Sequence, residues 1–109
     1  MKRGSIYWIN LEPSEPPKMG KVRPCLIISN SDQNMLLPSV VVVPLSSKPP
    51  KIWPLRVKIK VPKHKESFAV IPGIRQVSKS RLRELIGMAA DDSVEMLGEA
   101  LSLYLSEGV

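Results

Sequence analysis

The stretch Ser39-Val40-Val41-Val42-Val43-Pro44-Leu45 contains four successive valines and decides the expected fold class of this chain. β-Branched residues favour strands, and a continuous apolar run of this length is typical of a strand buried on both faces. We therefore expect a central strand at Ser39–Leu45. The run is far shorter than the ~20 residues that a membrane helix needs, so no membrane span is predicted here.

Shorter strand patterns lie on both sides of this run. Leu55–Val61 alternates apolar and basic residues, which predicts a half-buried strand with a basic outer face. Asn30–Pro38 is rich in turn residues, and Ser78 is expected to cap a helical turn that runs through Arg83. The remaining predicted strands are Ser5–Leu11, Cys25–Ser29, Ser67–Ile71, Ile74–Val77 and Leu85–Met88.

The C-terminal segment has a helical pattern. Asp91 or Asp92 is expected to cap the helix, because a carboxylate accepts hydrogen bonds from the free N–H groups of a helix start. Apolar residues then recur at spacings of three and four, which predicts one buried stripe made of Val94, Leu97, Leu101 and Tyr104. The expected fold is mainly β (α+β), a single domain over residues 1–109. It is a small, strongly bent barrel of five to seven strands with a C-terminal helix.

Composition excludes several classes of protein. The chain has 109 residues, of which 43% are hydrophobic and 24% charged, so it is expected to fold as one soluble, cytoplasmic domain. Eleven prolines argue against a helix bundle, since proline breaks helix interiors. One cysteine and one histidine are too few for an internal disulfide or a zinc centre. We therefore predict no metal and no cofactor.

Charge is unevenly distributed along the chain. The segment Lys48–Lys65 contains seven basic residues and no acid, whereas Ala90–Val109 contains five acids and no base. Such a basic segment is typical of a surface that faces a polyanion, either nucleic acid or an acidic protein tail. The alternative is a solvated edge strand, where lysine discourages aggregation.

Few residues offer chemistry, and each also has a plain structural interpretation. His64 is either a base or a solvated loop residue between two lysines, and Cys25 is either a nucleophile or a small core residue. Arg23 lies where a long loop enters a strand, so its guanidinium can reach a phosphate or pair with a carboxylate. Ser46 and Ser47 follow the end of the central strand. Their hydroxyl groups are either donors to a ligand or parts of an ordinary turn.

Four stretches of the sequence together resemble the MazF/PemK family of toxin endoribonucleases. The most specific features are the opening R-G-x-I-Y-W pattern and the later R-P-C strand. The matching stretches, in order, are Arg3–Pro13, Gly20–Asn30, Leu37–Ser47 and Ile74–Leu82.

The resemblance implies an SH3-like barrel, a homodimer and ribosome-independent, metal-independent cleavage of single-stranded RNA. In this family the 2′-hydroxyl of the substrate attacks the adjacent phosphorus and leaves a 2′,3′-cyclic phosphate and a 5′-hydroxyl. By motif, Arg23 is the catalytic arginine, and Ser46 occupies a position where the family mostly has threonine. Both side chains suit stabilisation of charge on phosphoryl oxygens. The general base is not assigned.

Partners follow from the same resemblance. We expect a small antitoxin with an acidic, disordered tail that lies along the basic groove and blocks it. Trp53 is available either to stack on a base or to pack beside Pro54. The residues expected to contact RNA are Lys18, Lys21, Ser47, Lys48, Lys51, Trp53 and Arg75.

The sequence departs from the family in two places. Pro16-Pro17-Lys18-Met19 replaces a Gly-Ser-Glu type of run, and Pro72-Gly73 replaces an acid and a glutamine. The alternative hypothesis is therefore a catalytically silent or CcdB-like protein on the same fold, which binds nucleic acid or a protein partner without cleavage.

Overall fold

The computed structural model describes residues 1–11, 22–48 and 50–107, which form a curved antiparallel sheet with a long helix against one end. The strands are β1 (Ser5–Asn10), β2 (Val22–Ile27), β3 (Ser39–Ser46), β4 (Arg56–Ile59), β5 (Ser67–Val70), β6 (Arg75–Ser78) and β7 (Leu82–Met88). The helices are α1 (Ser31–Leu36), α2 (Asp91–Leu105) and two single 3₁₀ turns, η1 (Ile71–Gly73) and η2 (Lys79–Arg81). This confirms the mainly β class and the C-terminal helix.

Strand β3 is the centre of the sheet, as its four valines predict. The order of strands is β4-β5-β3-β2-β1-β7, and β6 pairs with the first half of β3. The side chains of β3 alternate between two cores. Val40 and Val42 pack in one with Ile9 and Cys25, whereas Val43 lies in the other, against α2. Burial on both faces is therefore confirmed.

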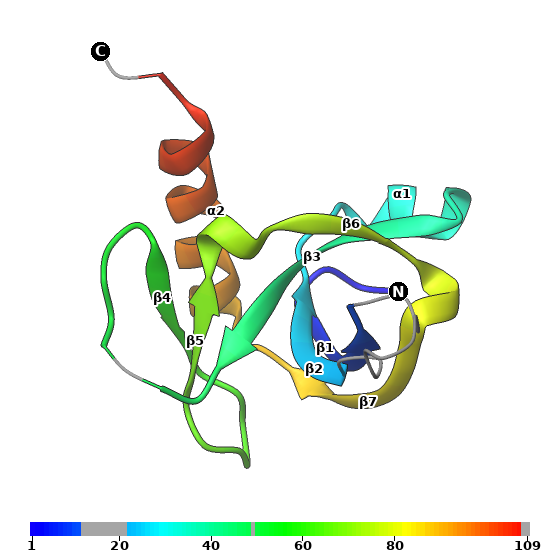
Figure 1. The fold of residues 1–109 in the computed structure, drawn as a ribbon, viewed down its shortest axis with the longest axis horizontal. Coiled ribbons are helices and arrows are strands. Elements are labelled where there is room, and N and C mark those ends of the chain that lie inside the picture. The colour runs from blue at the N-terminus through cyan, green and yellow to red at the C-terminus, as the bar shows by residue number, and fades with distance from the viewer. Residues whose placement is uncertain (12–21, 49, 108–109) are drawn as a thin grey trace, which may run out of the picture.

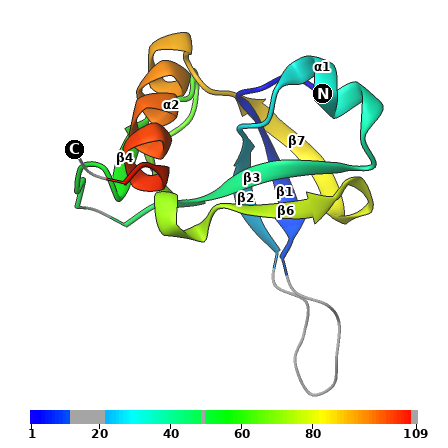
Figure 2. The same cartoon turned by 90° about the horizontal axis from the view of Figure 1, so that it is seen from above.

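The strands around β3 curl into the barrel, and α2 lies beside β4 and β5 (Figure 1). Figure 2 shows α1 at the end of the molecule away from α2. The pairing of β1 with β7 shifts register on both sides of Tyr7, and such irregularities bend a sheet. None of the helices in the described parts of the chain is long and apolar enough to cross a membrane.

The expectation that Asn30–Pro38 is only a turn was wrong, because it contains α1. Asn30 caps this helix, accepting hydrogen bonds from the N–H groups of Asp32 and Gln33 at 2.8 and 3.3 Å. The buried Asn34 side chain then donates to the carbonyls of Met1 and Ser29. Distant partners thus stabilise a helix too short to form alone.

The expected cap of α2 was also wrong. The N-cap is Ala90, which makes no side-chain capping bond, and Asp91 and Asp92 lie in the first turn, where their charges suit the helix dipole. The end of β4 holds this helix start instead. Lys60 accepts a hydrogen bond from the Ala90 N–H and donates its own N–H to the Ser93 hydroxyl at 2.8 and 2.9 Å.

Some element boundaries and faces also differ from the sequence patterns. β2 begins at Val22, β7 begins at Leu82, and the helical turn after Ser78 ends at Arg81. The buried face of α2 consists of Ser93, Leu97, Ala100 and Leu101, so the stripe shifts toward small residues that allow the helix close to the sheet. Tyr104 and Leu55 are exposed at 40% and 41%, so neither lies on the buried face that its pattern predicts.

Candidate active site

Arg23 and Ser46 come from neighbouring strands that have just separated. The last pair between β2 and β3 is Cys25 with Pro44. Arg23 on β2 and Ser46 on β3 each lie two positions beyond this pair. Past this point β3 leaves β2 and pairs with β5, where Ser46 is opposite Phe68. A cleft opens where the two strands diverge.

This cleft consists of two adjoining cavities of about 400 and 350 Å³, and Arg23, Leu45 and Ser46 line both of them. The first is completed by Trp8, Pro24, Ser47, Lys48 and Ser67, the second by Leu11, Pro44, Val70, Gly73 and Arg75. The structure therefore brings the two residues expected to be catalytic to one site.

The Ser46 hydroxyl is held by the turn that follows it. Its oxygen accepts a hydrogen bond from the Lys48 N–H at 3.1 Å, and the Lys48 carbonyl accepts one from the Arg56 guanidinium at 2.9 Å. Because the Ser46 oxygen is used as an acceptor, its proton remains available to a ligand in the cleft. Arg56 is thus a positioning residue for this hydroxyl, which the sequence did not identify.

Two guanidinium groups make the cleft cationic. The Arg23 side chain is exposed and makes neither a hydrogen bond nor an ion pair with any described residue. Arg75 enters from β6 and donates to the Leu11 carbonyl at 2.8 Å, and no other described residue accepts a hydrogen bond from its guanidinium. Permanently charged, planar donors of this kind suit the oxygens of a phosphate.

The pKa of the Cys25 thiol depends on burial and on the same two arginines. Burial raises the pKa of Cys25 from an ordinary 9.0 to about 12, and the nearby positive charges of Arg75 and Arg23 lower it in part. The side chain is fully buried, and its Sγ donates to the Arg23 carbonyl at 3.7 Å. A protonated, inaccessible thiol is no nucleophile, so the structure favours the core interpretation of Cys25.

The residues expected to contact RNA do not all line the same cleft. Ser47 and Lys48 line the cleft beside Trp8, and Arg75 lines its second cavity. Lys51 and Trp53 instead line a separate cavity between β4 and α2. Lys18 and Lys21 lie outside the described residues, as do Pro16-Pro17-Lys18-Met19.

The sequence patterns also missed Trp8 and Ser67. Trp8 is 42% exposed although Ile6, two residues earlier on the same strand, is buried. The alternation along β1 is kept, because Tyr7 and Ile9 pack in one core and Ile6 in the other. Trp8 therefore shares the face of Ile6, but at its position this face lines the cleft. Trp8 on β1 is opposite Pro24 on β2, and Pro24 directly follows Arg23. This neighbourhood of Trp8 and Arg23 could be recognised only once the strand register was known.

The fold and the site together define a small β-barrel protein with a cationic cleft, lined by Arg23 and Arg75. The chain belongs to the family of PemK-like, MazF-like toxins of type II toxin–antitoxin systems, whose family model matches residues 2–105. This confirms the resemblance and the expected role as the toxin of such a system.

Individual relatives agree with the family. The chain is 29% identical to the endoribonuclease MazF of Staphylococcus saprophyticus over 109 residues, covering 96% of this chain and 91% of the relative. Among solved structures, an endoribonuclease from a Mycobacterial species in complex with its cognate antitoxin is 23% identical with a TM-score of 0.80, covering 99% of each chain. MazF from Deinococcus radiodurans is 22% identical with a TM-score of 0.77, covering 96% of each chain.

Proposed function

We propose that this toxin-family chain is an endoribonuclease that cleaves single-stranded RNA without a metal ion and without the ribosome. The observation that carries the proposal is that Arg23 and Ser46 line one cleft, the first without a partner among the described residues and the second with a free proton. The name of the staphylococcal relative supports the same activity.

The reaction is an internal transfer at phosphorus. The 2′-oxygen attacks the adjacent phosphorus, the bond to the 5′-oxygen breaks, and the products are a 2′,3′-cyclic phosphate and a 5′-hydroxyl. The 2′-hydroxyl loses one proton and the departing 5′-oxygen gains one.

The protein stabilises the charge that gathers on the non-bridging oxygens in the transition state. Arg23 is proposed to donate two parallel hydrogen bonds to these oxygens, and Ser46 to donate one. Arg75, Lys48 and Ser47 would contact neighbouring phosphates or sugars, and Trp8 offers a face on which a base can stack. Neither Arg23 nor Ser46 acts as the base, since arginine stays protonated and an unassisted serine hydroxyl is a poor base.

The test is cleavage of a labelled single-stranded RNA by the purified protein in EDTA, with identification of the product ends. Arg23→Ala should reduce the rate by about 10²–10³-fold, as expected for loss of a charged donor to the transition state. Ser46→Ala should reduce it about tenfold, the value of one neutral hydrogen bond. Arg83→Ala is the matched control, because Arg83 is exposed and lines neither cavity.

Full cleavage by both Arg23→Ala and Ser46→Ala would remove the site assignment. Binding of the RNA without any cleavage by the wild type would instead support the alternative of a silent, CcdB-like binding protein. Measuring both properties on the same oligonucleotide separates the two hypotheses.

We further propose that the chain acts in the cytoplasm as a homodimer and is inhibited by an antitoxin with an acidic, disordered tail. The mycobacterial endoribonuclease solved in complex with its cognate antitoxin supports an antitoxin partner. Three successive apolar residues are exposed, Met35 at 77%, Leu36 at 82% and Leu37 at 51%, which supports coverage by another chain. Light scattering on the purified protein measures whether its mass is twice that of one chain.

A further inference from the structure

The cleft that contains Arg23 and Ser46 has room on both sides of a bound phosphate. Both residues line its two cavities, of about 400 and 350 Å³, so a phosphate that they hold lies where the cavities join. Each cavity has a volume typical of a small-ligand pocket, and the nucleosides on either side of the phosphate would occupy one cavity each. We call the cavity lined by Trp8 the first subsite and the cavity lined by Val70 the second subsite.

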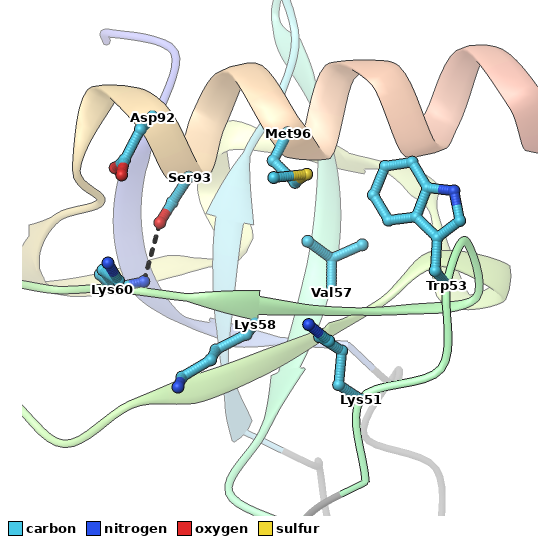
Figure 3. A pocket seen from close by; sticks show the side chains of 8 residues that line it. All are labelled: Lys51, Trp53, Val57, Lys58, Lys60, Asp92, Ser93 and Met96. Atoms are coloured by element: carbon cyan, nitrogen blue, oxygen red, sulfur yellow. Dashed lines mark hydrogen bonds between the residues drawn. The ribbon is translucent and has the colours of Figure 1, made fainter.

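Trp8 supplies the first subsite with an aromatic surface. It is 42% exposed and lies opposite Pro24 in the pairing of β1 with β2. The other tryptophan, Trp53, lines the separate cavity between β4 and α2 together with Met96 (Figure 3). Among the described residues that line the cleft, Trp8 is the one aromatic residue. Within this part of the cleft, a base can therefore stack on an aromatic ring in the first subsite but not in the second.

The first subsite also has hydroxyl groups that a base can contact. The next residues in the register of β3 with β5 are Ser47 and Ser67, which places them side by side. Both line the subsite, and neither hydroxyl bonds to any described residue. Because Ser47 directly follows Ser46, it suits the sugar or phosphate of the RNA, which leaves Ser67 for the base. A hydroxyl both donates and accepts, so it can bond to the polar edge of a base.

The second subsite has few groups that could distinguish one base from another. Arg75 is the one side chain, beyond Arg23 and Ser46, that can form hydrogen bonds among its described lining residues. It already donates to the Leu11 carbonyl at 2.8 Å, and its charge suits a phosphate better than a base edge. The other lining residues are Leu11, Pro44, Leu45, Val70 and Gly73.

The close approach of Gly73 to Pro44 keeps one wall of the second subsite bare. A Cβ atom on Gly73 would lie 2.6 Å from Cγ and 3.0 Å from Cδ of the Pro44 ring. Such distances are too short for real Cβ atoms, so only glycine allows the two backbones to lie this close. This wall therefore offers a base no side-chain donor or acceptor.

We propose that the base selectivity of the cleavage lies on one side of the cut bond only. The first subsite selects its base, which stacks on Trp8 and bonds to the Ser67 hydroxyl, whereas the second subsite accepts any base. The inference rests on the proposed function, because it concerns the RNA that the same cleft cleaves. It makes Ser67 a specificity-determining residue that the transfer at phosphorus does not itself require.

The test is cleavage of a pool of single-stranded RNAs with a randomised tract, followed by sequencing of the product ends. We expect the rate to vary at least about fivefold with the base on one side of the cut, the effect of hydrogen bonds to a base edge. On the other side it should vary less than about twofold, as expected without such bonds. A strong preference on both sides, or on neither side, would overturn the inference.

Variants then assign the two subsites. Ser67→Ala should reduce the preference on the selective side at least about twofold, because one hydrogen bond to the base is lost. Trp8→Leu should lower kcat/KM about tenfold for every base, since each base has a face that stacks. Val70→Thr adds a hydroxyl to the second subsite with little change of shape and should create a preference of about threefold on the other side. Ser102→Ala is the matched control, because Ser102 is exposed and lines neither subsite.

The outcomes separate this inference from the proposed function. An unchanged base preference in Ser67→Ala, or a new preference in Val70→Thr on the same nucleotide that Ser67 selects, would contradict the two subsites. Because the preference is read from cleaved products, these variants report on folded protein. Absence of cleavage by the wild type would overturn the proposed function and this inference together. Cleavage that depends on Arg23 but shows no one-sided preference would overturn this inference alone.

Discussion

Replacement of Arg56 by methionine tests whether the active-site hydroxyl is positioned from a distance. The Arg56 guanidinium donates to the Lys48 carbonyl at 2.9 Å, and the Lys48 N–H donates to the Ser46 hydroxyl at 3.1 Å. Arg56→Met removes the first of these bonds and leaves the remaining turn residues in place. The hydroxyl should then sample more positions and meet the phosphate less often.

The expected magnitude follows from that one hydrogen bond. A bond from a charged donor contributes ~1.5–3 kcal/mol, and partial exposure of Arg56 reduces this to about 1 kcal/mol, which corresponds to about a fivefold lower kcat/KM. Folding stability should change by less than about 1 kcal/mol. The buried Nε of Arg56 has no hydrogen-bond partner among the described residues, so its removal with the side chain offsets part of the lost bond.

The assay is a double-mutant cycle on RNA cleavage, with urea unfolding of each variant in parallel. If Arg56 acts through Ser46, Arg56→Met should have no further effect in a Ser46→Ala background. Arg83→Met is the matched control, since the Arg83 guanidinium also donates to a backbone carbonyl, that of Ser80, at 3.1 Å. Additive losses in the cycle would refute the reasoning, because they would show an effect that does not pass through the hydroxyl.

Three further predictions concern the cleft and the core. Arg75→Ala should weaken RNA binding and reduce the slope of log affinity against log salt by about 0.7, measured by titration at several salt concentrations, as one phosphate contact is lost. Because the folded pKa of Cys25 is raised from 9.0 to about 12, the thiol adds stability that is fully present below pH 9 and lost as pH rises toward 12. Urea unfolding of the wild type minus that of Cys25→Ser should therefore fall by up to ~1.4 kcal/mol per pH unit in this window, and a flat difference would contradict the shift. Asn34→Ala should cost about 2–3 kcal/mol in urea unfolding, since it removes the hydrogen bonds that the buried Asn34 amide donates to the carbonyls of Met1 and Ser29, and a loss below about 0.5 kcal/mol would show that water replaces them.

The order of short strands, the central position of the valine run and the C-terminal helix could all be predicted from the sequence. These features depend on local periodicity, on β-branched residues and on the positions of proline and glycine, which act over a few neighbouring residues. The family followed from local stretches as well, and Arg23 and Ser46 were named because they lie within those stretches. Short-range patterns therefore determined the class of fold and the candidate pair.

Tertiary structure decided which side chains meet. β2 and β3 separate beyond the pair of Cys25 and Pro44, and this separation opens the cleft. Arg56 from β4 donates to the Lys48 carbonyl and so holds the turn that follows Ser46. Trp53, although close in sequence to Ser46, lines the separate cavity between β4 and α2 and not the cleft. Strand register and curvature arise from contacts between residues far apart in the chain, so a local pattern cannot specify them.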